Sequence, residues 1–513
     1  MMSNKRLVAT CAIAFCCNVA LLVLFVKYNG GERYHINIDK HQEVKIFMPD
    51  DFLSVGIDTS EIQNYDKIDF KKTRLRDLAA ALSPARLRLG GTMSERLIFS
   101  PDNVSVTCND CVNNSHSKSV CSAVNLLCKH KFLPYFIMTG EKWTEINDFC
   151  QNSKLKLLFT FNVLLQDENG WNDKNAKELL EYSKHKHFKI DWQLGNEPNS
   201  FNHVFGTTIS PKTLAGYFDT LRKLLNKTGY KHSLLVGPDT TRPQPKCPNC
   251  LQYMLDFLEH GSHYINVRSW HQYYLNSKTA TLGDFWNPDT FNLLKNQIET
   301  MKNHTKKYNK IPMWLTETSS SYGGGAPGLS NSYAGSPLWI DKLGLTAKYN
   351  ITTVVRQSLI GGNYSLIDNE LEPLPDWWLS VLYKKLVGNE VLKISSDCTH
   401  HQRLYAHCTN KKYKGGRGAV TLFAINLKMA KARFLLNGTA LHGRNLHIDE
   451  YIISAPSNNR RSKTILLNGW PLYYESSLPD LQPRHLKYGR DISMPPYSIA
   501  FWVIKNTTIK ACH

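Results

Sequence analysis

Short apolar runs recur along the chain between residues 50 and 390. They are rich in β-branched, leucine and aromatic residues, and Gly, Asp, Asn or Pro flank each of them, as in strands that are covered on both faces. We therefore predict eight strands, over residues 52–57, 85–89, 155–162, 189–194, 233–236, 264–270, 312–315 and 352–356.

Between these runs the apolar positions recur at spacings of three and four, which is typical of helices with one buried face. The pattern is clear over residues 175–186, 213–225, 291–301 and 338–349. Eight strand–helix alternations predict an α/β fold, a (β/α)8 TIM barrel over residues 49–388. A doubly wound open sheet is the alternative, but no Gly-x-Gly-x-x-Gly follows the first strand.

The pattern changes after residue 388, where short apolar runs follow one another without comparable helices. We expect strands over 403–407, 419–427, 432–436, 447–453, 464–467 and 499–504. Such spacing predicts an antiparallel β-sandwich domain over residues 389–513. An extended stretch at 35–47 favours one more sandwich strand within residues 31–48, before the barrel begins.

The first 30 residues have a pattern of their own. Lys5 and Arg6 precede an uncharged run of 20 residues from Leu7 to Val26. As a helix this run would measure roughly 30 Å, about one bilayer core. We interpret it as a signal anchor that attaches the chain to a membrane, with a signal peptide cleaved near Val19 as the alternative.

Sequons and cysteines indicate the secretory pathway. Seven candidate glycosylation sites have the Asn-x-Ser/Thr pattern, at Asn103, Asn113, Asn226, Asn303, Asn350, Asn437 and Asn506. Ten of the 13 cysteines lie outside the apolar run, an even number that favours disulfides. Cys108-x-x-Cys111 and Cys247-x-x-Cys250 also resemble zinc half-sites, but an oxidising compartment favours disulfides and we expect no metal.

The charge indicates an anionic partner. Lys and Arg number 62 against 43 Asp and Glu, which gives a formal net charge of +19. Nucleic acid, anionic lipid and acidic polysaccharide all fit this charge. The sequence has no zinc-finger pattern and no Gly-rich phosphate loop, so we expect no nucleic-acid partner.

Two glutamates stand at strand ends, Glu197 after the fourth predicted strand and Glu317 after the seventh. Strands of a barrel present their carboxyl ends at one mouth, where catalytic side chains lie. Two carboxylates there can cleave a glycosidic bond, if one is protonated and the other ionised. Ordinary surface glutamates at loop starts are the alternative.

Several strings around these glutamates resemble glycoside hydrolase family 79, the family of heparanase-type endo-β-glucuronidases. They include Gly195-Asn-Glu-Pro-Asn-Ser-Phe201, Glu317-Thr-Ser-Ser-Ser-Tyr-Gly-Gly-Gly-Ala-Pro327, Ser83-Pro-Ala-Arg-Leu-Arg-Leu-Gly-Gly-Thr92 and Trp270-His-Gln-Tyr-Tyr-Leu-Asn276. The resemblance extends from about residue 45 to the C-terminus. It implies a retaining enzyme acting on heparan sulfate or a related acidic glycosaminoglycan, without a cofactor. Glu197 would be the proton donor and Glu317 the nucleophile.

The resemblance also implies a substrate-binding set. This comprises Asp58, Thr92, Asn196, Arg242, Gln244, His271, Tyr273, Lys278, Tyr322, Gly323, Gly324, Gln357, Gly362 and Tyr364. Three of these residues also have a purely structural interpretation. Asn196 would then form a turn, Tyr273 would pack in the core, and the imidazole of His271 would be hydrogen-bonded within the core. The family match further implies a Cys408–Cys512 disulfide and a secreted, lysosomal or membrane-anchored location.

Three departures from the family pattern bear on specificity and maturation. Arg242-Pro-Gln244 reverses the family's Gln-Pro-Arg, and Lys278 replaces an arginine. The linker that heparanases lose by proteolysis is shortened to a Cys-rich stretch at 103–130, so two-chain maturation does not transfer directly. Two alternatives therefore stay open: a non-catalytic heparan-sulfate-binding relative of the heparanase-2 kind, and a β-glucuronidase of different specificity.

Overall fold

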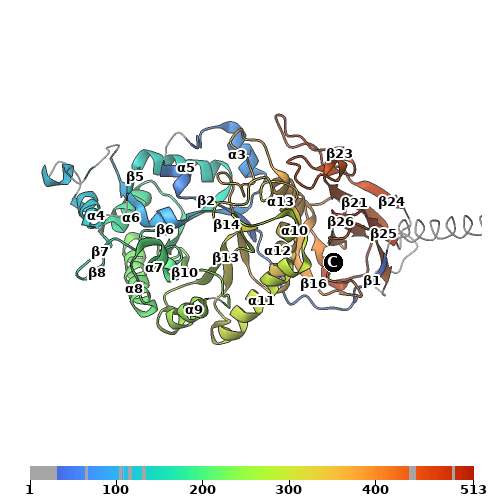
Figure 1. Ribbon diagram of the computed structural model, residues 1–513, viewed down its shortest axis with the longest axis horizontal. Helices are drawn as coiled ribbons and strands as arrows, with labels where there is room; N and C mark the ends of the chain where they lie inside the picture. The colour runs from blue at the N-terminus through green and yellow to red at the C-terminus, as the bar shows by residue number, and fades with distance from the viewer. Residues whose placement is uncertain are drawn as a thin grey trace, which may run out of the picture.

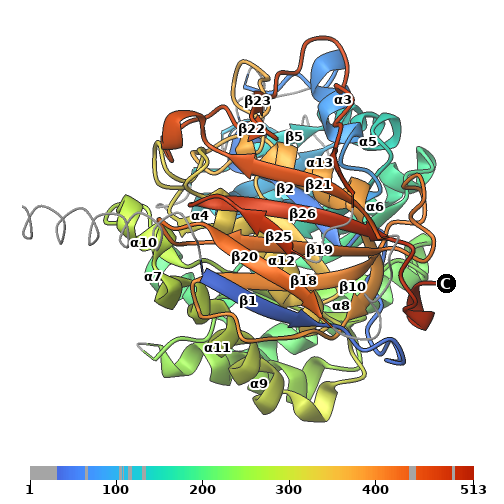
Figure 2. The same cartoon turned by 90° about the vertical axis from the view of Figure 1, so that its right-hand side faces the viewer.

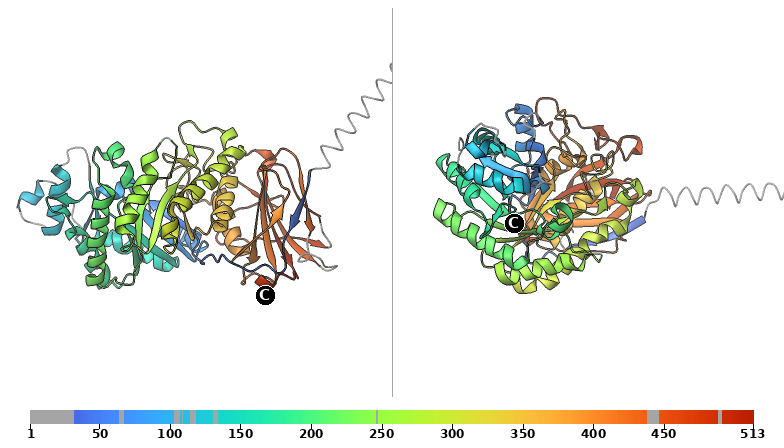
Figure 3. Two further views of the ribbon diagram at one scale, coloured as in Figure 1. Left: turned by 90° about the horizontal axis from the view of Figure 1, so that it is seen from below. Right: turned by 60° about the vertical axis from the view of Figure 1, so that its left-hand side comes forward.

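A parallel barrel and a β-sandwich lie side by side (Figure 1; left view of Figure 3). This computed structural model describes residues 32–63, 67–102, 107, 109–113, 118–129, 134–245, 247–437, 446–487 and 491–513. In both views the barrel occupies one end of the molecule and the sandwich the other.

The barrel closes in the strand order β10-β11-β13-β15-β2-β3-β6-β9, with every neighbouring pair parallel. Its strands are β2 (Leu53–Asp58), β3 (Ala85–Gly90), β6 (Leu155–Phe161), β9 (Ile190–Leu194), β10 (Leu235–Thr240), β11 (Val267–Gln272), β13 (Met313–Thr318) and β15 (Thr353–Gln357). All eight predicted strands are confirmed. β10 and β13 continue beyond their apolar runs, because polar residues at the barrel mouth still pair with neighbouring strands.

Helices surround the barrel. The longer ones are α3 (Thr73–Ala80), α4 (Lys118–Lys129), α5 (Gly140–Asn152), α6 (Lys174–His185), α8 (Pro211–Thr228), α9 (Pro248–Gly261), α11 (Pro288–His304), α12 (Ser336–Lys348) and α13 (Pro375–Leu386). The short ones are α2 (Ser60–Gln63), α7 (Phe201–Phe205) and α10 (Leu282–Trp286), with 3-10 turns at Thr92–Arg96, Asp110–Asn113, Pro198–Ser200, Lys306–Tyr308, Pro456–Asn458 and Lys510–Cys512. Helix α12 is buried from Ser336 to Ala347, because strand β18 of the sandwich packs on its outer side.

Three small sheets lie in the connections of the barrel. They pair β4 (Leu97–Ser100) with β5 (Phe136–Thr139), β7 (Gln166–Asp167) with β8 (Gly170–Trp171), and β12 (Leu275–Asn276) with β14 (Ser321–Tyr322). The last of these pairs joins the loops that follow β11 and β13.

The sandwich consists of an eight-stranded and a four-stranded sheet (Figure 2). The larger sheet contains β16 (Val387–Leu392), β18 (Gln402–Thr409), β19 (Val420–Asn426), β21 (His447–Ser454), β22 (Leu466–Leu467), β23 (Trp470–Pro471), β24 (Arg484–Lys487) and β26 (Ser498–Lys505). The smaller one contains β1 (Glu32–Asn37), β17 (Ser395–Ser396), β20 (Ala432–Asn437) and β25 (Asp491–Met494). Ile36, Phe434 and Trp502 are among the side chains buried between them.

Strand β1 joins the sandwich as expected, although it begins at Glu32 and ends at Asn37, earlier than the predicted stretch at 35–47. It pairs antiparallel with β17 but parallel with β20, with Ile36 opposite Leu436. The sandwich is therefore antiparallel except at this one described contact.

The predicted signal anchor, residues 1–30, lies outside the described residues. Among the residues that are described, none of the helices has the length and apolar character needed to cross a membrane. Asn103 and the side chains of Asn113 and Asn437 also lie outside the description. The remaining predicted glycosylation sites, Asn226, Asn303, Asn350 and Asn506, are exposed.

Disulfides join Cys408 to Cys512, Cys111 to Cys121 and Cys247 to Cys250. Cys247 and Cys250 therefore bond to each other and do not form a zinc half-site. The expected disulfides are present, although the even number of cysteines does not mean that all of them pair, because the thiols of Cys150 and Cys398 are free. Cys150 is a core residue of α5, where a thiol packs like any small apolar group.

Candidate functional site

Glu197 and Glu317 meet at the mouth of the barrel, with His271 from β11 between them. The imidazole Nδ1 lies 2.8 Å from Glu197 Oε1 and 3.9 Å from Glu317 Oε2. One oxygen of each glutamate and a nitrogen of His271 all lie within 4.8 Å of one another. The fourth and seventh strands thus bring the two predicted carboxylates into one site.

Glu317 is held by two donors in a nearly closed environment. Tyr273 donates its hydroxyl to Oε1 over 2.7 Å, and Arg88 donates Nη1 to Oε2 over 2.9 Å. Burial raises the pKa of Glu317, but the charges of His271 and Arg88 and the Tyr273 hydrogen bond outweigh it and lower the pKa overall. The lowered pKa favours the ionised form of Glu317.

Arg88 connects the site beneath the glutamates and is itself fully buried. Its Nη2 donates to Asn196 Oδ1 and to Asp239 Oδ2, both over 2.8 Å. Its Nε donates to Gln193 Oε1 over 2.8 Å. Arg88 was not assigned a role from the sequence, although Arg86 and Arg88 both interrupt the apolar run of β3 and a buried arginine needs acceptors.

Asp239 is a third acid of the site, also missed from the sequence. Besides Arg88, it accepts hydrogen bonds from Gln193 and from the Thr316 hydroxyl. Burial raises the pKa of Asp239, but His271 and Arg88 outweigh burial and hold the pKa well below its usual range. Asp239 is therefore a permanent negative charge under the imidazole.

His271 is a buried cation among carboxylates rather than a simple core imidazole. Its Nε2 lies 2.9 Å from Asp239 Oδ2 while Nδ1 faces Glu197. Burial lowers the pKa of His271, but Asp239 and Glu317 outweigh burial and raise the pKa to about 10. Although the three ligand atoms have the spacing of a metal site, both ring nitrogens face carboxylates and the raised pKa favours a proton over a metal cation there.

The backbone around Glu197 is tightly fixed. Glu197 has a left-handed conformation (φ 53°, ψ 52°), and its N–H donates to the Asp239 carbonyl over 3.0 Å. The preceding N–H, of Asn196, donates to Glu95 Oε1 over 2.8 Å, and Glu95 Oε2 accepts the Val163 N–H over 2.8 Å. Burial raises the pKa of Glu95 to about 8, against the backbone donors that lower it. Glu95 was not predicted from the sequence, because it directly precedes Arg96 in a polar stretch without a motif of its own.

Two glycine-containing loops, at residues 322–324 and 362–364, meet at the rim of the barrel mouth. The Asn363 N–H donates to the Gly324 carbonyl over 2.7 Å. Gly323, Gly324 and Gly362 have φ values of 79°, 86° and 72°, a region that favours glycine. Tyr364 from the second loop stacks against Tyr273, with ring centroids 6.4 Å apart. The predicted residues of these two loops therefore do lie together.

Asp58 and Gln357 lie at the ends of β2 and β15. Gln357 Nε2 donates to Asp58 Oδ2 over 3.0 Å. Burial and the charge of Glu317 raise the pKa of Asp58 to about 6. These two residues belong to the same electrostatic cluster as the glutamate pair.

The other predicted contacts lie further out. The guanidinium of Arg242 is 5.0 Å from the centre of the Tyr322 ring, and Glu197 is one of its electrostatic neighbours. Lys278 and Thr92 are exposed, and Gln244 is half-buried in the turn before α9. The structure thus brings Arg242 next to the site, whereas Lys278, Thr92 and Gln244 stay predictions from the sequence.

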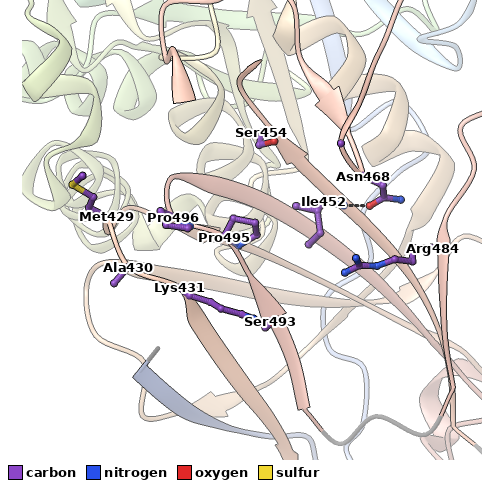
Figure 4. A pocket seen from close by; sticks show the side chains of 11 residues that line it. Met429, Ala430, Lys431, Ile452, Ser454, Asn468, Arg484, Ser493, Pro495 and Pro496 are labelled. Carbon is purple, nitrogen blue, oxygen red and sulfur yellow. Dashed lines mark hydrogen bonds between the residues drawn. The ribbon is translucent and has the colours of Figure 1, made fainter. Parts of the chain in front are cut away.

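A separate cavity lies in the sandwich (Figure 4). Ile452 and Ser454 of the larger sheet and Ser493 of the smaller one line it, together with Lys431 and Arg484. Its lining residues contain no carboxylate. Because cleavage of a glycosidic bond needs a pair of carboxyl groups, the barrel mouth is a better candidate for the hydrolytic site than this cavity.

Comparison with known proteins agrees with this site. The N-terminal domain of glycosyl hydrolase family 79 matches residues 57–344. The chain belongs to glycosyl hydrolase family 79. Heparanase of Bos taurus is 36% identical to this family 79 hydrolase over 493 residues, covering 90% of the chain and 89% of the heparanase. Inactive heparanase-2 of Homo sapiens is 30% identical over 521 residues, with 90% and 87% covered.

A solved structure extends the comparison of the fold. The 4-O-α-L-rhamnosyl-β-D-glucuronidase of Fusarium oxysporum matches this family 79 hydrolase with a TM-score of 0.65 at 12% identity. The match covers 92% of this chain and 100% of that one. At this identity the likeness concerns the fold alone, the barrel together with its sandwich.

Proposed function

We propose that this hydrolase is a retaining endo-β-glucuronidase that cleaves heparan sulfate chains, with Glu197 as acid/base and Glu317 as nucleophile. The observation that carries this proposal is the approach of one oxygen of each carboxylate to within 4.8 Å. Retaining glycosidases separate their carboxyl groups by about 5–5.5 Å, whereas inverting ones need about 6.5–9.5 Å to admit a water.

The different surroundings of the two glutamates support their different roles. Glu317 is ionised and immobilised by Tyr273 and Arg88, which suits attack on an anomeric carbon. The Glu197 side chain is 28% exposed, against 12% for Glu317, and it contacts the imidazolium of His271. Glu197 can therefore receive and release protons at the surface of the site.

The reaction would proceed in two displacements. Glu317 attacks the anomeric carbon while the glycosidic C–O bond breaks, and the proton of Glu197 passes to the leaving oxygen. Glu197, now a carboxylate, removes a proton from water, and the resulting hydroxide displaces Glu317 from the sugar. His271 and Arg88 stabilise the carboxylate form of Glu317 before and after this cycle.

Features around the pair support an acidic sugar as substrate. Backbone amides of the loops at 322–324 and 362–364 can approach a uronate carboxylate closely because glycines occupy these positions. Asn196, whose amide oxygen is held by Arg88, would hydrogen-bond the sugar's 2-hydroxyl. The net charge of +19 attracts a polyanionic chain over a longer range.

Incubation of the protein with heparan sulfate in a mildly acidic buffer tests the proposal, with chain length followed by size exclusion. We expect shortening by the unaltered protein and by Glu259→Gln, an exposed carboxyl-to-amide control on α9. Glu317→Gln should lose activity, and with an activated aryl glucuronide, whose leaving group needs no proton, azide should restore turnover to Glu197→Ala but not to Glu317→Gln. Shortening by Glu317→Gln would contradict the assigned nucleophile.

A β-glucuronidase of different specificity is the second candidate, favoured by the Arg242-Pro-Gln244 order and by Lys278. Arg242 lies against Tyr322 and has Glu197 as an electrostatic neighbour, so it can select the charge pattern of the sugar. Activity on an unsulfated glucuronide polymer, with heparan sulfate left intact, would support this candidate. Binding of heparan sulfate without cleavage of either polymer would instead support a non-catalytic protein, as the name of the human relative describes.

We also infer that the chain enters the secretory pathway, anchored in a membrane through residues 1–30. The disulfides and the exposed sequons among the described residues support an oxidising, glycosylating compartment. Extraction with carbonate, followed by removal of N-glycans, tests this. The chain should stay with the membrane pellet and lose mass on deglycosylation, and release into the supernatant would contradict the anchor.

A further inference from the structure

The Cys247–Cys250 disulfide lies next to the segment that contains Thr241 and Arg242. It closes a four-residue ring at the start of α9, with Cys247 as the N-cap residue and Cys250 in the first turn. Cys247 is half-buried, whereas Cys250 is 5% exposed. The two other described disulfides lie in the sandwich and in the segment around α4.

One hydroxyl connects this disulfide to the acid/base segment. Thr241 donates its Oγ1 hydrogen to Cys250 Sγ over 3.4 Å. The same oxygen accepts a hydrogen bond of 2.7 Å from Asn199 Nδ2, and the Thr241 N–H donates to Asn199 Oδ1 over 3.1 Å. Asn199 follows Glu197 by two residues, and Arg242 is the next residue after Thr241.

The ring also shapes the turn that carries the predicted specificity residues. The Cys247 N–H donates to the Gln244 carbonyl over 2.9 Å, and these two residues form an antiparallel bridge. The disulfide therefore fixes one end of the segment that begins at Thr241. Opening the ring frees Cys247, and with it the turn behind Arg242.

We propose that Cys247–Cys250 is a thiol–disulfide exchange site whose oxidised form holds Arg242 and Gln244 in the substrate-binding arrangement. The co-reactant is a dithiol, either a small molecule or the dithiol of an oxidoreductase. The predicted effect on substrate binding rests on the proposed function, whereas the exchange chemistry does not.

The exchange balances as a transfer of two electrons and two protons. A thiolate of the dithiol attacks Cys247 Sγ, the more accessible sulfur, and forms a mixed disulfide as the Cys247–Cys250 bond breaks. Cys250 leaves as a thiolate, which the Thr241 hydroxyl and the N-terminal end of α9 stabilise. The second thiol of the dithiol then displaces Cys247, so the dithiol becomes oxidised and both cysteines are reduced.

The chemistry is tested by equilibrating the whole protein in dithiothreitol buffers of graded potential and locating free thiols by alkylation and mass spectrometry. Cys247 and Cys250 should become alkylated before Cys408 and Cys512, which are 3% and 8% exposed. Earlier reduction of Cys408–Cys512 would overturn the proposal.

The effect of the disulfide on substrate binding is tested with a fluorescent heparan sulfate oligosaccharide, whose binding is measured by anisotropy. Reduction should raise the Kd about fivefold, the effect of losing roughly one ordering hydrogen bond. Cys247→Ser/Cys250→Ser should have the raised Kd in both buffers, whereas Cys111→Ser/Cys121→Ser should respond like the unaltered protein. A double variant at 247 and 250 that binds like the oxidised protein would contradict the inference.

The hydrogen bonds through which Thr241 connects the disulfide to Asn199 are tested separately, by measuring oligosaccharide affinity in variants that keep the disulfide. Thr241→Val should weaken binding with the disulfide intact, and Thr241→Ser should keep the affinity of the unaltered protein. Equal affinities for Val and Ser would contradict the link. Oxidised protein that binds the oligosaccharide but never cleaves it would contradict the proposed function alone, since thiol mapping and binding still judge the exchange site.

Discussion

At the scale of single residues, the site depends on compensation among buried charges. Arg88 and His271 are surrounded by Asp239, Glu317 and Glu197. A buried charge without a partner is strongly unfavourable, so each member of this cluster sets the protonation of the others. The cluster keeps Glu317 ionised in a place where burial alone would protonate it.

Replacing Arg88 by lysine tests this compensation. Lysine retains one charge but lacks the planar fork that reaches Gln193, Asn196 and Glu317 together. We expect kcat to fall about 100- to 1,000-fold, the effect of removing one preorganised donor. Because lysine lacks the Nη1 hydrogen bond that holds the carboxylate form of Glu317, the acid limb of the kcat/KM profile should move to higher pH. Arg76→Lys, at a half-exposed arginine of α3, is the control that should leave the profile unchanged.

Glu95 acts through the backbone of its neighbours. Both of its oxygens accept N–H groups, so the amide of Glu95→Gln would set an NH2 against one of those donors. An unsatisfied buried group costs about 1–3 kcal/mol, so we expect a lower Tm and a reduced kcat. Thermal unfolding and heparan sulfate cleavage, with Glu259→Gln as control, measure the two effects. An unchanged Tm would show that the carboxylate is dispensable.

At the scale of elements, the two rim loops act as one unit because their backbones touch. An added Cβ at Gly325 would lie 2.7 Å from Asn363 C, closer than atoms can approach. Gly325→Ala should therefore separate the loops and raise KM about tenfold, with a smaller change in kcat, if backbone amides there bind the uronate. Gly206→Ala has a similar positive φ of 65° but open space around it, so it controls for backbone strain alone. Equal KM values in the two variants would contradict a role for the loop contact.

The predicted elements and the missed residues differ in the physical signal that each leaves in the sequence. The eight strands were predictable because their apolar runs are buried on both sides. The polar ends of β10 and β13 were not, since Thr240, Glu317 and Thr318 pair there only because neighbouring strands surround them, while Asp239 and Thr316 lie at irregularities of the pairing. Glu197 and Glu317 were found from their positions after apolar runs, whereas Arg88 and Glu95 gain their roles only through contacts distant in sequence.

At the scale of the whole molecule, barrel and sandwich share a buried polar contact. Asp341 of α12 is fully buried and accepts hydrogen bonds from Arg403 Nε over 2.8 Å and from the Tyr405 hydroxyl over 2.5 Å. Both partners belong to β18. Because α12 presents one face to the barrel and another to this strand, the two units should unfold together rather than one after the other.

Asp341→Asn tests that coupling. The neutral amide leaves the Arg403 charge without its partner, and loss of one member of a buried pair costs about 3–5 kcal/mol. We expect a single calorimetric transition in the unaltered protein and a lower Tm, or two separated transitions, in the variant. Asp397→Asn is the control. It removes an exposed ion pair with His35 within the sandwich domain, and the loss of such a pair lowers the free energy of unfolding by about 0–1 kcal/mol. Two transitions in the unaltered protein would mean that the sandwich folds independently of the barrel whose mouth carries the glutamate pair.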